Sequence, residues 1–304
     1  MSVTSIRLRE AWNWGGLTVK QLAVRTYQQI ETHEALDRAA ALAFYAMLSL
    51  VPFLSLLLAG GIGTQSGNSS QLLALSRQFL PTQAATVIED QVRKMQAAAP
   101  AGLFSFSWAI LLWSASSFFV GLMDAINAAH GVRDSRPWWK RRIMAVVLTI
   151  VEAALLTAAL VLIVAWPFML DYIGLAGMAS ALATVVRWAV ALVALLATFA
   201  IAYSFGPDVK QEWEWITPGS VLGVLVLVAA SVTLRMYVQY IGSYSETYGA
   251  LAGVVLTLLW LYTAALALLV GAEVNCVIGH AAPRGRHPGE KIALQEPRAM
   301  QPSA

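Results

Sequence analysis

A first candidate site consists of three charged residues inside long apolar segments of this sequence: Glu152, Arg187 and Arg235. A charge within a membrane span is costly and usually faces the interior of a helix bundle or a water-filled cavity. Glu152 and Arg187 belong to successive segments that would run antiparallel, so an ion pair is within reach. Either this pair, with Arg235, lines a polar pathway for an anionic or amphiphilic substrate, or it is a structural pair that fixes helix register. Arg235 lies near the end of its segment and could instead extend to the headgroups.

A second candidate site lies in the last apolar segment, where Glu273 and Asn275 interrupt a long uncharged run. An acid and an amide within one helical turn could bind a cation or a proton. They could equally form an interhelical contact, with Asn127 or Tyr203 as partners at the same membrane level. Both interpretations stay open.

The sequence shows no cluster suited to catalysis. Metal-assisted hydrolysis of a phosphodiester needs several His, Asp or Glu side chains around one or two ions. The four histidines are isolated, and none has a second histidine or a carboxylate at ligand spacing in a recognisable motif: His33, His130, His280 and His287. The chain has a single cysteine, Cys276. We therefore expect no catalytic residues, no metal and no cofactor, which argues against an enzyme and against a ribonuclease in particular.

The composition indicates an integral membrane protein. Hydrophobic residues make up 58% of the chain and charged residues 12%, with a mean hydropathy of +0.64. Soluble domains carry about twice that fraction of charge. The net charge of +3 would suit nucleic acid, but the basic residues lie beside the apolar segments, where topology signals are found.

Six apolar segments are long enough to cross a bilayer as helices. We predict an all-α polytopic membrane protein with a transmembrane domain at 39–279 and spans at about 39–62, 103–123, 143–166, 181–205, 216–240 and 249–278. Pro52 lies near the middle of the first span and is predicted to kink it. Pro167 is expected to end the third. The small-residue patterns Gly219-x-x-x-Gly223 and Gly249-x-x-x-Gly253 permit close helix contact, but such patterns recur by chance in Ala- and Gly-rich spans.

The distribution of Lys and Arg predicts the orientation. With the N-terminus in the cytoplasm, fifteen basic residues lie in cytoplasmic segments and three in external ones, and Arg187 and Arg235 lie within spans. This is a strong positive-inside bias. The N- and C-termini are both predicted to be cytoplasmic.

Three segments flank the spans. Residues 1–38 contain an amphipathic helix that either lies on the membrane surface or packs on the cytoplasmic side of the bundle. Residues 64–101 form a periplasmic amphipathic loop that either caps a cavity or covers the end of the bundle. Residues 280–304 form a cytoplasmic tail whose Pro-, Arg- and Gln-rich composition indicates disorder.

Several short motifs follow one another along residues 20–280. They are Ala41-Leu42-Ala43-Phe44-Tyr45 with Ser49 and Pro52, Trp113-Ser114-Ala115, Asn127 followed by Gly131-Val132 and Arg136, Tyr203 with Pro207, Tyr248-Gly249, Trp260-Leu261-Tyr262, and Gly271-Ala272-Glu273-Val274-Asn275. In these motifs the chain resembles the YihY/virulence factor BrkB family of bacterial inner-membrane proteins, once labelled the ribonuclease BN family. The resemblance implies a six-helix bundle in the bacterial cytoplasmic (inner) membrane.

The polar residues within spans favour a transporter or flippase-like protein for a lipid or another anionic amphiphile. The alternative is a non-transporting scaffold that contributes to envelope integrity or virulence. Membrane lipids are the expected partners, a homo-oligomer is possible, and nucleic acid is not expected. An open, hydrated cavity shared by Glu152, Arg187 and Arg235 would favour transport, whereas dry ion pairs would favour the scaffold.

Overall fold

The computed structural model describes residues 12, 14–62, 101–172, 179–209, 216–240 and 250–282. Within these ranges the protein is helical and contains no strand. Its elements are η1 (Trp14–Gly16), α2 (Val19–Thr32), α3 (Ala35–Ile62), α6 (Ala101–Ala129), α7 (Trp138–Tyr172), α8 (Ala179–Phe205), α9 (Pro218–Tyr240) and α11 (Ala250–Ala281). The predicted all-α class is confirmed.

Four helices of the described residues are long and apolar enough to span a membrane. These segments are Trp138–Ala159, Trp188–Phe205, Pro218–Tyr237 and Gly253–Ala281. They overlap the last four of the six predicted spans. The helices at the first two predicted spans, α3 and α6, contain 28 and 29 residues, more than the roughly 20 that a bilayer core requires.

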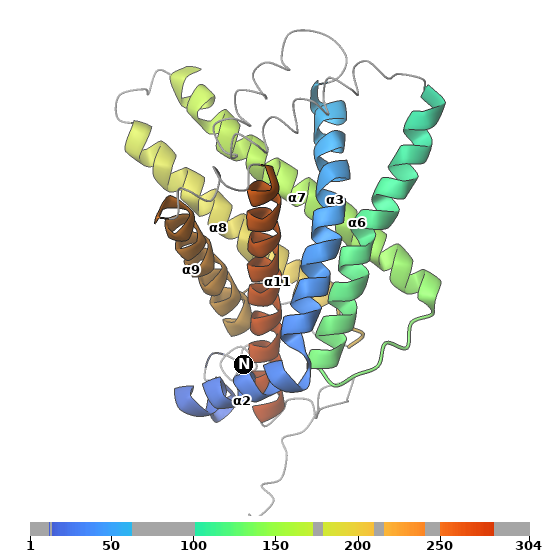
Figure 1. Cartoon of the computed structure of the whole chain (residues 1–304). Coiled ribbons are helices and arrows are strands. Elements are labelled where there is room, and N and C mark those ends of the chain that lie inside the picture. Colours follow the sequence, from blue (N-terminus) through green and yellow to red (C-terminus); the bar gives the residue numbers. More distant parts are fainter. Residues whose placement is uncertain are drawn as a thin grey trace, which may run out of the picture.

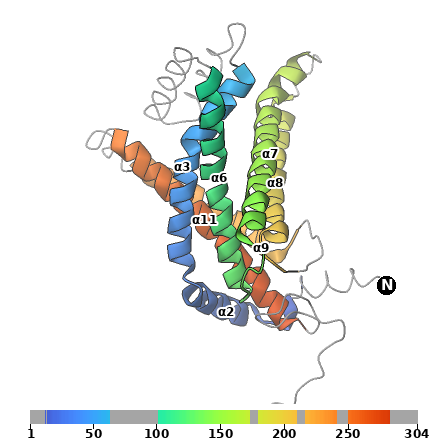
Figure 2. The same ribbon diagram turned by 90° about the vertical axis from the view of Figure 1, so that its right-hand side faces the viewer.

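α11 is the central helix of the bundle. It packs against α9 on one side and against α3 on the other, and it also contacts α2 and α6. The antiparallel pairs α3–α6 and α7–α8 flank it (Figures 1 and 2). The helices converge where α2 lies, which we call the packed end, and diverge at the opposite, splayed end (Figure 1).

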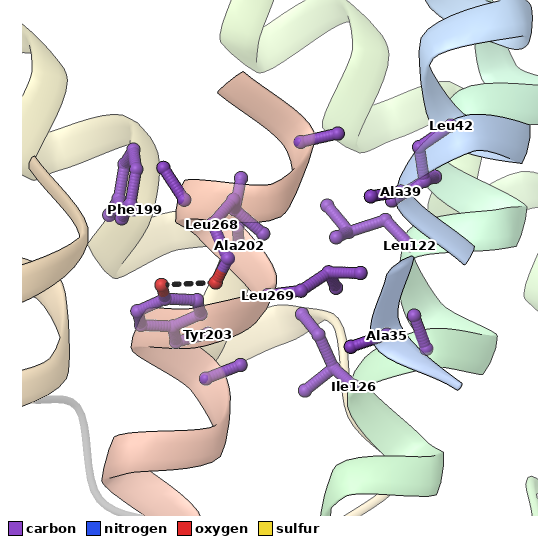
Figure 3. Close-up of a cluster of buried hydrophobic side chains, with 14 of the residues drawn as sticks. Ala35, Ala39, Leu42, Leu122, Ile126, Phe199, Ala202, Tyr203, Leu268 and Leu269 are labelled. Carbon is purple, nitrogen blue, oxygen red and sulfur yellow. Dashed lines mark hydrogen bonds between the residues drawn. The ribbon is translucent and has the colours of Figure 1, made fainter. Parts of the chain in front are cut away.

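The hydrophobic core lies at the packed end. The start of α3, the end of α6, the end of α8 and the second half of α11 meet there in one cluster (Figure 3). Its members include Ala35, Ala39, Leu42, Leu122, Ile126, Phe199, Ala202, Tyr203, Leu268 and Leu269. Small residues are frequent in this cluster, so the helix backbones approach one another closely, as is common between membrane helices.

α2 begins with a complete capping box. The Thr18 hydroxyl accepts a hydrogen bond from the Gln21 amide at 3.3 Å, and the Gln21 side chain accepts one from the Thr18 amide at 2.9 Å. Such reciprocal bonds satisfy two amide groups that the first helical turn leaves free. α2 packs on α11 and α3, and it exposes Val19 and Tyr27. A helix therefore lies within the segment predicted to be amphipathic, and it both covers the bundle and exposes apolar side chains.

Two prolines, Pro52 and Pro167, lie in the interior of described helices. α3 continues through Pro52, and the predicted kink there stays a prediction. α7 continues past Pro167 to Tyr172, whereas the sequence suggested an end at Trp166. The apolar sequence continues after Pro167, and membrane helices tolerate proline because neighbouring groups can bond to the freed carbonyl.

Some predictions lie outside the described residues. These concern the amphipathic loop at 64–101, apart from its last residue at the start of α6, and the tail from residue 283 onward.

Candidate functional site

Glu273 lies in the buried half of α11 and contacts the N-terminal helices. Its Oε1 lies 2.8 Å from Nδ1 of His33, in the short connection between α2 and α3. The Glu273 side chain is almost fully buried, and its second oxygen, Oε2, has no hydrogen-bond partner. The contact therefore joins residues 240 positions apart and holds the α2–α3 connection against the central helix.

Asn275 joins α11 to the start of α9. Its Oδ1 accepts a hydrogen bond from the Gly219 amide at 2.8 Å, and its Nδ2 donates to the Thr217 hydroxyl at 2.9 Å. Thr217 precedes the first helical residue, Pro218, and exchanges side-chain-to-amide bonds with Ser220. Because proline and a hydroxyl-bearing cap suit a helix start, α9 begins here for local reasons. Asn275 then fixes this start to α11.

Tyr203 joins α8 to α11. Its hydroxyl donates to the Leu268 carbonyl oxygen at 2.6 Å, inside the hydrophobic core (Figure 3). A carbonyl within a helix already accepts one backbone bond, and its second lone pair is free for such a contact. Tyr203 also closely approaches Gly271 of α11. Neither Tyr203 nor Asn127 is the described hydrogen-bond partner of Glu273 or Asn275.

Asn127 instead belongs to a polar network at the end of α6. Its Nδ2 donates to Asp134 at 3.2 Å, and its Oδ1 accepts from the Asp208 amide at 2.7 Å. Arg136 binds Asp134 through Nε and Nη2, at 2.8 and 2.7 Å, and also donates to the Gly206 carbonyl oxygen. The network ties the α6–α7 loop to the segment after α8.

The network also controls the charge of Asp134. Burial alone would raise the pKa of this carboxyl, but the hydrogen bonds and the positive charge of Arg136 outweigh it and lower the pKa. Asp134 is therefore held as a carboxylate, with its side chain nearly buried in an otherwise largely exposed loop. This bidentate Arg–carboxylate pair gives the loop a defined shape.

His130 and Cys276 form another contact between α6 and α11. The cysteine Sγ lies 3.4 Å from Nδ1 of the histidine, and that nitrogen also lies 2.9 Å from the Ile126 carbonyl oxygen. Both side chains are buried. Within the described residues, no group of three or more His, Cys, Asp or Glu side chains is suited to hold a metal ion.

Glu152 is buried in the middle of α7, against α8. It continues the buried stripe of Ala145 and Leu148, and neither of its carboxylate oxygens has a hydrogen-bond partner. The hydroxyl of Thr198 on α8 is the polar group that faces it, and that hydroxyl is itself buried and unbonded. This is a carboxyl group enclosed between two membrane helices.

Among the three charged residues of the predicted pathway, the structure describes the side chains of Glu152 and Arg235. Arg235 is exposed on α9. The side chain of Arg187 is outside the described part, but its position on α8 is known. It lies eleven residues, or about 16 Å along the axis, from Thr198. That register works against a direct Glu152–Arg187 contact, and the pair stays a prediction.

Family comparison agrees with this architecture. The family model described as Virulence factor BrkB matches residues 26–293. The chain belongs to the virulence factor BrkB family. It is a multi-pass membrane protein with several apolar helices of transmembrane length.

Relatives of this BrkB-family chain are named either as a ribonuclease-like protein or as UPF0761 membrane proteins. The Bacillus subtilis protein named putative ribonuclease-like protein YfkH is 26% identical over 83% of this chain and 93% of its own length. UPF0761 membrane proteins of Chromohalobacter salexigens and Paraburkholderia xenovorans are each 28% identical, over 83% and 84% of this chain. The aligned region covers only 62% and 59% of those two proteins. No solved structure matches the chain.

The main partners in these contacts could not be found from the sequence of this BrkB-family protein. His33 and Thr198 were missed because each meets its carboxyl across a long sequence separation, where spacing gives no signal. Asp208 was missed because it follows Pro207 in a short polar loop. The order of the motifs was the available signal, since Asn127 and Arg136 belong to the loop network and Pro207 directly precedes Asp208.

Proposed function

We propose that this protein is a transporter or flippase-like protein of the bacterial inner membrane that handles a lipid or another anionic amphiphile. It has six spans, including α3 and α6, with both termini in the cytoplasm. The packed end is then the cytoplasmic end, because the basic α6–α7 loop lies there.

The observation that supports transport is the uneven burial of α11. In its second half, residues such as Ala265, Ala267 and Ala272 are almost fully buried. In its first half, large apolar side chains are 39–47% exposed: Val254, Val255, Leu258, Leu259 and Trp260. Consecutive positions 258, 259 and 260 point in different directions around a helix of 3.6 residues per turn. The central helix is therefore uncovered on several sides toward the splayed end.

An uncovered central helix suits an amphiphilic substrate. Apolar side chains at the splayed end could contact acyl chains, while headgroups could meet polar and basic groups at the edge of the bundle. Contacts at the packed end hold that end together, so rearrangement there would be needed to complete a passage. A helix bundle that is packed at one end and diverges at the other is one of the two states that alternating access requires.

The test is movement of lipid in reconstituted liposomes. Fluorescently labelled anionic phospholipid in the inner leaflet should reach the outer leaflet faster with the protein than in protein-free liposomes. Leu258→Trp should slow this movement because it fills the uncovered part of α11. Val19→Trp, at an exposed position of α2 at the packed end, is the matched control and should not.

The competing function is a scaffold that does not transport. The observation in its favour is that His33, Asn275 and Tyr203 all form interhelical contacts, as structural residues would. Equal lipid movement with and without the protein would remove the transport proposal and leave the scaffold.

A further inference from the structure

The Glu152 carboxyl differs from the other buried acid of the described part. Glu273 has His33 as a partner for one oxygen, whereas both oxygens of Glu152 are buried without any hydrogen bond. The residue is only 5% exposed. Natural proteins rarely leave a buried polar group unsatisfied, so each such group calls for a specific explanation.

No described cation faces this carboxyl. On α7, the guanidinium of Arg142 lies over the Trp113 ring at 3.7 Å and bonds to α6. The acid of α6 at the packed end, Asp124, is paired with Arg141. From α8, the segment 188–205 contains no charged residue, and its polar group toward Glu152 is the Thr198 hydroxyl.

An ionised carboxylate in this position would have no countercharge among the described side chains, and the Thr198 hydroxyl would be its single nearby donor. Such a group costs far more free energy than a neutral one, and this cost is greatest in the apolar interior of a membrane protein. A protonated carboxyl carries no charge and gains one O–H donor. Thr198 supplies an acceptor that is otherwise unbonded.

The geometry points to a proton-binding site between α7 and α8. Glu152 holds the proton as a neutral acid and donates a hydrogen bond to Oγ1 of Thr198 once the two side chains close the remaining gap. Binding forms an O–H bond with a proton taken from water. Release returns the proton to water and leaves a carboxylate that the present packing does not stabilise, so release requires α7 and α8 to rearrange.

This site would give transport its source of energy. Gain and loss of the proton would favour different packings of α7 on α8, so a proton gradient could drive the conversion between them. That role rests on the proposed function, whereas proton binding itself does not.

The site can be tested without any transport assay. Infrared spectra of the purified protein in liposomes at neutral pH should contain the carbonyl stretching band of a protonated carboxylic acid. Glu152→Gln should remove the band, and its neutral side chain of the same shape should leave the fold intact. Thr198→Val should move the band to higher frequency because a hydrogen bond is lost. Glu31→Gln, at an exposed carboxyl of α2, is the control and should change nothing.

Absence of the acid band from the wild type, or its persistence in Glu152→Gln, would overturn the proton site. A metal cation bound to Glu152 would also appear as absence of the band, since the carboxylate would then be ionised. The two proposals fail separately. If the Glu152 band is present but lipid movement does not depend on the protein, the transport proposal is removed and the proton site stands. If the protein moves lipid but the band is absent, the proton site is removed and the transport proposal stands.

Discussion

Asn275 holds two helices together with one side chain. Asn275→Ala would remove both hydrogen bonds to α9 and leave the buried Gly219 amide without its acceptor. Because leaving a buried donor unsatisfied costs about 1–3 kcal/mol, the variant should unfold at a lower temperature in detergent. Thr233→Ala is the control on α9, since its exposed hydroxyl bonds only to a carbonyl of its own helix. Equal losses in the two variants would show that the contact between Asn275 and the start of α9 does not stabilise the bundle.

The contact between Asp134 and Arg136 depends on pH. The pKa of Asp134 is lowered in the folded protein, because the bonds and charge of Arg136 outweigh the effect of burial. The contact therefore contributes its full stabilisation of the folded protein above the unfolded-state pKa of about 3.9. This stabilisation is lost as the pH falls through the lower pKa that Asp134 has in the folded protein. Asp134→Asn should be less stable than wild type at pH 7, and the difference in melting temperature should shrink below about pH 4. A difference that stays constant across this range would contradict the assignment.

At the scale of helices, α9 and α11 pack through small residues on both sides. A Cβ at Gly219 or Gly271 would overlap the other helix, and one at Gly223 would meet Phe199 and the Ala267 backbone. Gly271→Ala should therefore separate the helices, at a cost of about 1–3 kcal/mol in the free energy of unfolding. Gly279→Ala, on α11 with open space around it, should be neutral or slightly stabilising because alanine favours helix. The unfolding temperatures of Gly271→Ala and Gly279→Ala test this difference, and equal temperatures would contradict a close contact at Gly271.

The sequence predicted the helices well and their contacts poorly. Hydrophobic length alone located α8, α9 and α11 to within a few residues, because a bilayer imposes one length on every span. The Gly219-x-x-x-Gly223 pattern proved to mark a contact, yet nothing in the sequence distinguished it from chance repetition. Glu152 was recognised as unusual, but its neighbour Thr198 depends on the register between α7 and α8. Side-chain contacts of this kind depend on how the helices pack, and packing cannot be predicted from a single sequence.

For the whole molecule, the main prediction is that the packed end faces the cytoplasm. Cys276 lies against His130, so the end of α11 and the α6–α7 loop must lie at the same end of the bundle. The basic residues of that loop then orient the bundle. In a Cys276→Ser background, cysteines at the exposed positions Arg133 and Lys20 should react with a membrane-impermeant thiol reagent only after cells are permeabilised. A cysteine at Asn68, in the predicted periplasmic loop, should react in intact cells. Reaction of Arg133→Cys and Lys20→Cys from opposite sides would exclude this topology, and with it a cytoplasmic packed end.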